Sequence, residues 1–98
     1  MTRNPQRCPT HPGAMLREDV LPAIGMSKTE FARLLGISRQ HLYDMLNERK
    51  PVSPEVAVRL AKLLGGAAIS WVRMQGAYDS WHAERKVDVS GITPLEAA

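Results

Sequence analysis

The sequence predicts an all-α protein in which five helices form a single domain. The chain has 98 residues, enough to bury one hydrophobic core without a disulfide or a metal ion. Apolar residues recur along most of it at the three- and four-residue spacing of amphipathic helices, and serine caps and glycine stops separate the helical stretches. Only the short run 87–90 alternates like a strand, so no sheet is expected.

The chain is expected to have three parts: a flexible N-terminal arm over residues 1–13, a helical domain over 14–86 and a C-terminal tail over 87–98. The arm contains three prolines and no regular apolar spacing. A first helix then runs from about Ala14 to Leu21, with Leu16 and Val20 on its apolar face.

The second helix begins at the capping box of residues 27–30, in which the serine hydroxyl and the glutamate carboxylate each bond to the other residue's backbone N–H. Phe31, Leu34 and Leu35 have the spacing of one buried face. Gly36 supplies a left-handed residue, so the helix is expected to end there after barely two turns.

The third and fourth helices also begin at serine caps. Ser38 caps the third helix, which turns Leu42, Met45 and Leu46 inward. The fourth helix begins at Ser53-Pro54-Glu55, where a cap, a proline at the first helical position and an early acid favour the same boundary. Its core-facing residues are Val56, Leu60, Leu63 and Leu64, and it ends at the glycine pair 65–66.

A fifth helix is predicted from about Ala68 to Arg85 by an aromatic and methionine stripe: Trp71, Met74, Tyr78 and Trp81. Trp71 is assigned to the core. Tyr78 and Trp81 lie two to three turns further out, where a small domain has little left to cover them. We therefore expect these two residues to form a homodimer interface, with burial inside the same chain as the alternative.

The second and third helices together have the pattern of a helix-turn-helix. Ala32 is small where the helices cross, Gly36 turns the chain, and Ile37 and Leu42 fill the angle between them. This turn points the start of the third helix outward, as in recognition helices that enter the major groove of DNA. A DNA-binding role is favoured over that of an ordinary helical hairpin.

The expected DNA contacts follow from that geometry. Arginine and glutamine have the donor geometry to read guanine and adenine. The predicted base contacts are Ser38, Arg39, Gln40, Tyr43, Asp44 and Asn47. The predicted phosphate contacts, from residues that flank the helix at either end, are Lys28, Thr29, Arg49 and Lys50.

In these motifs the chain resembles the Cro/repressor-type (XRE) helix-turn-helix proteins and, within them, the HigA-type antitoxins of toxin–antitoxin modules. The resemblance runs from His11 to about Ser90. Its narrower marks are His11-Pro12-Gly13, Ser53-Pro54-Glu55, and Trp71 with Gln75 and Tyr78. It implies a lambda-repressor-like domain that binds double-stranded operator DNA as a homodimer, represses its own operon and neutralises a cognate HigB or RelE-like ribonuclease toxin.

Two residues depart from the family's pattern. Glu48 stands where a glycine usually follows the asparagine that closes the recognition helix, which costs about 1 kcal/mol if this residue is left-handed. Asp44 places a negative charge on the DNA-facing side, where it could accept from a cytosine amine or weaken the approach of phosphates. Both concern affinity and leave the fold unaffected.

Composition excludes several other classes. The net charge of +3 permits a nucleic-acid partner. No stretch has the length of a membrane span, and the single cysteine agrees with a cytoplasmic protein. Cys8 and His11 have C-x-x-H spacing but no further nearby ligand, so neither a metal nor a cofactor is expected. His41 has no nucleophile or paired carboxylate at a suitable spacing, so no catalytic residue is assigned and an enzyme is not expected.

Two alternatives stay open: a stand-alone or phage-type repressor without a toxin, and an interaction adaptor that has lost DNA binding through Asp44 and Glu48. A toxin is expected to dock on a preformed surface, with the first helix near Arg17 and Glu18 and the last helix near Asp79 and Glu84 as candidates. A reading frame for a basic RelE-like protein beside this gene would separate the antitoxin from the repressor.

Overall fold

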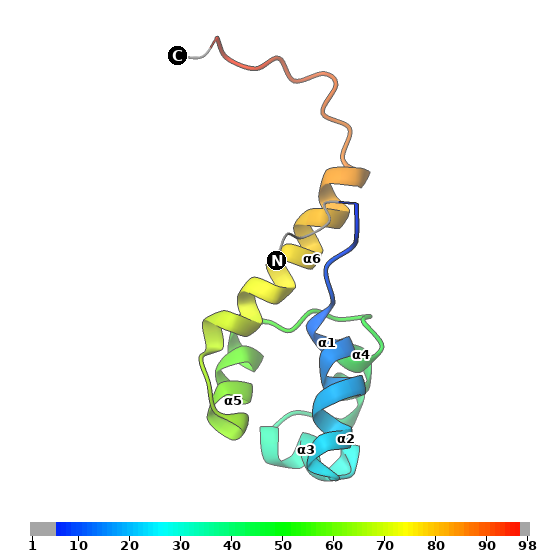
Figure 1. Ribbon diagram of the computed structural model, residues 1–98, viewed down its shortest axis with the longest axis vertical. Coiled ribbons are helices and arrows are strands. Elements are labelled where there is room, and N and C mark those ends of the chain that lie inside the picture. Colours follow the sequence, from blue (N-terminus) through cyan, green and yellow to red (C-terminus); the bar gives the residue numbers. More distant parts are fainter. Residues whose placement is uncertain (1–5, 97–98) are drawn as a thin grey trace.

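The described residues, 6–96 of a computed structural model, form a bundle of short helices from which one long helix projects (Figure 1). They contain no strand, and the all-α prediction is confirmed. The first five residues of the predicted arm and the last two of the predicted tail lie outside the described range. The elements are α1 (Pro12–Met15), η1 (Leu16–Val20), α2 (Leu21–Ile24), α3 (Lys28–Leu35), α4 (Arg39–Leu46), α5 (Pro54–Leu64) and α6 (Ala68–Lys86).

The first helix is longer than its apolar pattern predicted. It runs without interruption from Pro12 to Ile24 as α1, η1 and α2, and its middle turn is π-helical. The predicted start at Ala14 is two residues late because His11 acts as the N-cap. Its ring Nδ1 accepts a hydrogen bond from the backbone N–H of Gly13 at 2.8 Å, and the proline then occupies the first helical position, where no N–H is needed.

The starts of α3, α4 and α5 are as predicted, because each depends on a local hydrogen bond. The hydroxyls of Ser27, Ser38 and Ser53 each accept from the backbone N–H three residues further on, at 3.0–3.2 Å. The second half of the capping box at α3 differs from the prediction. The carboxylate of Glu30 accepts from Arg33 on the same helix, which lowers the pKa of that carboxyl.

The core contains most of the side chains predicted for it, with two exceptions. Leu34 is 42% exposed and Leu63 is 37% exposed, so their predicted inward orientation is wrong. On both helices the buried arc is centred closer to a small residue, Ala32 on α3 and Ala57 on α5, each of which is buried. Where alanines allow helices to approach closely, the buried face rotates toward them and leaves the leucine on the other flank in solvent.

Helix α6 packs against α5 through its first half and extends beyond the bundle (Figure 1). Trp71 is buried there, as predicted, and so is Gln75. Along the second half of α6 lies the segment that precedes α1, in which the thiol of Cys8 is 3.5 Å from the imidazole Nε2 of His82. In residues 6–96 no helix combines the length and apolar character needed to cross a membrane.

Candidate nucleic-acid interface

Helix α4 has one fully buried side and one exposed side. Leu42, Met45 and Leu46 are at most 2% exposed, whereas Arg39 and Gln40 at its start are exposed. The hinge with α3 is filled by the buried Ala32 and the half-buried Ile37, as the helix-turn-helix pattern predicted. The helix is therefore anchored along its length while its polar side remains available to a partner.

The first turn of α4 combines a capped backbone with exposed polar side chains. The Ser38 hydroxyl oxygen accepts from the N–H of His41 at 3.0 Å, which leaves its own O–H as a donor. Arg39 has no polar partner within the part of the chain that the structure describes. Gln40 donates from Nε2 to the Oδ1 of Asp44 at 3.0 Å, so its amide is held in one orientation along the helix.

Asp44 is engaged inside the protein. Its carboxylate Oδ1 accepts from Gln40, and its Oδ2 lies 3.7 Å from the Nζ of Lys50. The backbone carbonyl of Asp44 also accepts from the N–H groups of Arg49 and Lys50, at 2.8 and 3.2 Å. The negative charge that the sequence placed toward DNA is thus paired, and the residue organises the turn that follows α4. Asn47 ends the helix as its exposed C-cap.

Glu48 adopts the left-handed backbone conformation, with φ of 62°. It is the only non-glycine residue with positive φ among residues 6–96, and the conformation costs about 1 kcal/mol relative to glycine. Arg17 on the first helix lies beside it. The Arg17 guanidinium is 3.4 Å from the Glu48 carboxylate and donates to the carbonyl oxygen of Leu46 at 2.5 Å.

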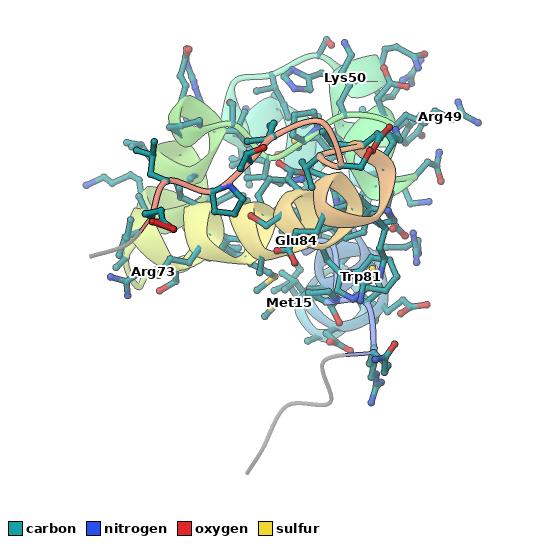
Figure 2. All side chains as sticks on the ribbon, turned by 90° about the horizontal axis from the view of Figure 1, so that it is seen from above. Met15, Arg49, Lys50, Arg73, Trp81 and Glu84 are labelled. Atoms are coloured by element: carbon teal, nitrogen blue, oxygen red, sulfur yellow. The ribbon has the colours of Figure 1, made fainter. Side chains whose placement is uncertain are left out.

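The four residues predicted to contact phosphates are exposed at the two ends of the motif. Lys28 and Thr29 lie in the first turn of α3, and the Lys28 Nζ is 5.6 Å from the ring centroid of Tyr43, which is 37% exposed. Arg49 and Lys50 follow α4 and project away from the bundle in Figure 2. Basic groups therefore flank the exposed side of α4 at both ends.

The two aromatic residues predicted for a dimer interface are half-buried within the chain. The Tyr78 ring lies edge-on to the His11 ring, with centroids 4.8 Å apart, and 4.4 Å from that of His82. The guanidinium of Arg85 lies 3.7 Å from the centroid of the Trp81 ring. The segment before α1 thus covers part of the aromatic surface of α6 that the sequence analysis expected to be exposed. The indole N–H of Trp81 is buried and has no hydrogen-bond partner in residues 6–96.

Three residues have roles that the sequence reasoning missed. His11 caps the first helix, and burial of its ring lowers its pKa. Arg17 contacts the end of α4 as described above. Gln75, on α6, accepts a hydrogen bond from the backbone N–H of Val52 at 2.8 Å. The only signals in the sequence were the His11-Pro12-Gly13 motif and the place of Gln75 among the residues that carry the family resemblance. Neither signal predicts which atoms these residues contact.

Comparisons with known proteins agree with this geometry. The model of the helix-turn-helix family matches residues 16–72. Virulence-associated protein I of Dichelobacter nodosus is 37% identical over 86 residues, which cover 87% of this chain and 80% of that protein. The antitoxin GraA in complex with its operator has a TM-score of 0.84 at 32% identity, with both chains fully covered.

A further solved structure is an addiction module antidote protein of the HigA family from Coxiella burnetii. It has a TM-score of 0.78 at 32% identity, over 91% of this chain and all of that one. The structural relatives of this chain are thus antitoxins of the GraA and HigA type, as the sequence resemblance indicated.

Proposed function

Because the chain belongs to the helix-turn-helix family, a class of DNA-binding regulators and not of enzymes, we propose that it binds operator DNA and acts as an antitoxin. The observation that carries the proposal is the start of α4, where exposed Arg39 and Gln40 stand on a helix whose opposite side is fully buried. Similarity to GraA, whose structure includes its operator, supports the same role.

In this proposal the start of α4 reads bases in the major groove. The unpaired guanidinium of Arg39 can bind a guanine through two hydrogen bonds, and Gln40 presents its amide to an adenine. The remaining predicted base contacts are Ser38, Tyr43, Asp44 and Asn47. We assign Asp44 a weaker role than the others, because both of its carboxylate oxygens already have partners. Phosphates are contacted by Lys28, Thr29, Arg49 and Lys50.

The test compares operator and random duplexes over a range of salt concentrations. Arg39→Ala should lose about 1 to 3 kcal/mol of binding free energy on the operator and relax one base position. Arg73→Ala removes the same charge from α6, on the side of the molecule opposite Arg49 and Lys50 in Figure 2, and is the matched control, expected to leave binding unchanged. Equal losses on both duplexes for Arg39→Ala would overturn the assignment to base reading.

The proposal includes a homodimer formed through the second half of α6. Tyr78 and Trp81 remain only half-buried within the chain, which leaves part of both aromatic side chains available to a second copy. A dimer requires two half-sites about one helical turn apart, or a multiple of it. Trp81→Ala should lower the dimer fraction in sedimentation equilibrium and thereby the apparent operator affinity. If Trp81→Ala remains dimeric at micromolar concentration, Trp81 belongs to the core of its own chain and not to the dimer interface.

The toxin partner in this proposal is a basic RelE-like ribonuclease. Up to Gly66 the chain has ten basic and six acidic residues, whereas from Ala67 onward it has three and four. This difference favours α6 over the first helix as the surface for a basic partner, because the first helix lies in the more basic part of the chain. The two candidate surfaces are on the first helix near Arg17 and Glu18 and on α6 near Asp79 and Glu84. A groove of about 480 Å³ lies between these two helices, and its lining includes Asp19 and Arg73.

Co-expression with the product of the neighbouring gene tests the toxin partner. Co-purification and restored growth are expected. Loss of both would favour a stand-alone repressor. Rescue that survives Arg39→Ala would show that toxin neutralisation and DNA binding use separate surfaces.

A further inference from the structure

Gln75 is a buried polar side chain on α6 that the proposed DNA contacts do not use. Only 6% of its surface is exposed. Its carbonyl oxygen Oε1 accepts from the backbone N–H of Val52 at 2.8 Å, and its amide Nε2 donates to the Oδ1 of Asp79 at 3.0 Å. Both ends of the amide are thus engaged, so the side chain is held in one orientation.

Val52 belongs to the segment that joins α4 to α5, residues 47–53, which contains no helix. Its side chain is 2% exposed, and its N–H would be left buried without a partner if Gln75 were absent. This segment carries Arg49 and Lys50, the two exposed basic residues at the end of α4. Gln75 therefore bonds to the segment that carries two of the proposed phosphate contacts, although it lies on α6, 23 positions away from Val52 in the sequence.

The connecting segment has two anchors, and the backbone of the two basic residues belongs to the first of them. At its start the carbonyl of Asp44 accepts from the N–H groups of Arg49 and Lys50. At its end Gln75 holds Val52. The intervening Pro51 has a restricted backbone and no N–H of its own. The carboxylate of Asp44 also pairs with the Lys50 Nζ at 3.7 Å. The position of the two basic side chains therefore depends on both anchors, the end of α4 and the place where α6 holds Val52 through Gln75.

We propose that Gln75 is a positioning residue that sets the 47–53 segment, so that Arg49 and Lys50 reach DNA phosphates only while α6 is correctly packed. The inference rests on the proposed DNA-binding function and deepens it. If α6 is displaced, the hydrogen bond between Gln75 and Val52 moves the 47–53 segment with it. Helix α6, which carries Tyr78 and Trp81, therefore affects DNA binding without contacting DNA.

The first measurement is the salt dependence of duplex binding by Gln75→Leu, at a temperature where circular dichroism shows the variant to be fully folded. Each lost phosphate contact reduces the slope of log K against log salt by about 0.9, so we expect a slope lower by about 1 to 2 and a roughly tenfold loss of affinity at low salt. Ser80→Ala, an exposed change on the same helix, is the control and should retain the wild-type slope.

A rescue variant separates positioning from general stability. Gln75→Glu combined with Asp79→Asn exchanges donor and acceptor between the two side chains and keeps the net charge. At about pH 8 the carboxylate at position 75 is ionised and can accept from both Val52 and the new amide. This double variant should recover the wild-type salt slope, whereas Gln75→Glu alone, which faces the carboxylate of Asp79, should not.

A double-mutant cycle completes the test. Lys50→Ala should cost the wild-type protein several-fold in affinity but cost Gln75→Leu much less, because the lysine is already displaced. Equal costs in both backgrounds, or an unchanged slope in folded Gln75→Leu, would overturn the positioning role and leave the proposed function intact. If the wild-type protein binds neither operator nor random duplex, both proposals are wrong.

Discussion

The two ends of the recognition helix α4 are held in place by different means. Its start depends on neighbours in the sequence: the left-handed Gly36, with φ of 74°, and the Ser38 hydroxyl that caps the first turn. Its end depends on distant segments. The backbone of Gly13 packs directly on the carbonyl of Met45, and Arg17 donates to the carbonyl of Leu46.

This difference separates the residues proposed to read the bases from those that set the orientation of α4 in the bundle. The start, where the proposed base contacts lie, is formed mainly by a few consecutive residues. One distant contact supports the turn before it, from the Arg59 guanidinium to the carbonyl of Leu35 at 3.0 Å. The end is joined to the first helix and, through the segment after α4, to α6. A change at the end should therefore alter how α4 sits in the bundle, whereas a change at the start should alter only α4 itself.

Gly13→Ala is expected to give the largest effect on this comparison. A Cβ added at Gly13 would overlap the carbonyl oxygen of Met45, a backbone atom that cannot move aside cheaply. We expect a loss of roughly 3 kcal/mol in the free energy of unfolding, measured by urea denaturation. Gly76→Ala is the control: it lies inside α6 with no atom within 4 Å of the added Cβ, and should stabilise by about 0.5 to 1 kcal/mol. A mild effect at Gly13 would mean that the end of α4 is not held by this contact.

Ser38→Ala should have a smaller effect, confined to the start of α4. It removes the acceptor for the N–H of His41 and should cost about 1 kcal/mol of unfolding free energy. Ser38→Gly is the comparison, because glycine at this position costs only a few tenths of a kcal/mol. Hydrogen exchange of the backbone amides should rise only at the start of α4. An equal rise in α1 and α6 would show that the start of α4 is not determined by neighbouring residues alone.

Glu48→Gly should stabilise the end of α4 slightly. Glycine relieves the left-handed conformation, worth about 1 kcal/mol, but removes the partly exposed ion pair with Arg17, worth at most about that amount. We expect a net gain of about 0.5 kcal/mol in thermal unfolding. Glu48→Ala loses the ion pair but keeps the left-handed conformation, so it should lower the thermal stability. If Glu48→Ala instead raises the thermal stability, the gain in Glu48→Gly comes from the removed charge and not from the backbone.

The last prediction concerns pH, through the cap of the first helix. Only the neutral ring of His11 can accept at Nδ1, and burial lowers its pKa from 6.5, against the opposing charges of Glu48 and Asp79. Because the folded pKa lies below the unfolded one, this contribution to stability is complete above pH 6.5 and is lost as the pH falls through the folded pKa. His11→Asn keeps a cap that does not titrate, so urea denaturation should show a flatter pH dependence. Identical pH dependence would contradict the assignment.

The elements that could be predicted from the sequence are those with a local cause. The starts of α3, α4 and α5 each follow from a serine that bonds three residues ahead. The orientations of Leu34 and Leu63 could not be predicted, because the spacing of apolar residues gives the width of a helix face but not its centre. That centre depends on which neighbouring helix approaches closest.

The sequence by itself determined the helices, the turn between α3 and α4, and the outward polar set at the start of α4, because these depend on hydrogen bonds and steric limits within a few residues. Only the tertiary structure decided that Asp44 is paired by Lys50, that Arg17 contacts the end of α4, and that Gln75 holds Val52. The last two contacts join residues 29 and 23 positions apart. Such contacts follow from how the helices pack, which no local pattern records.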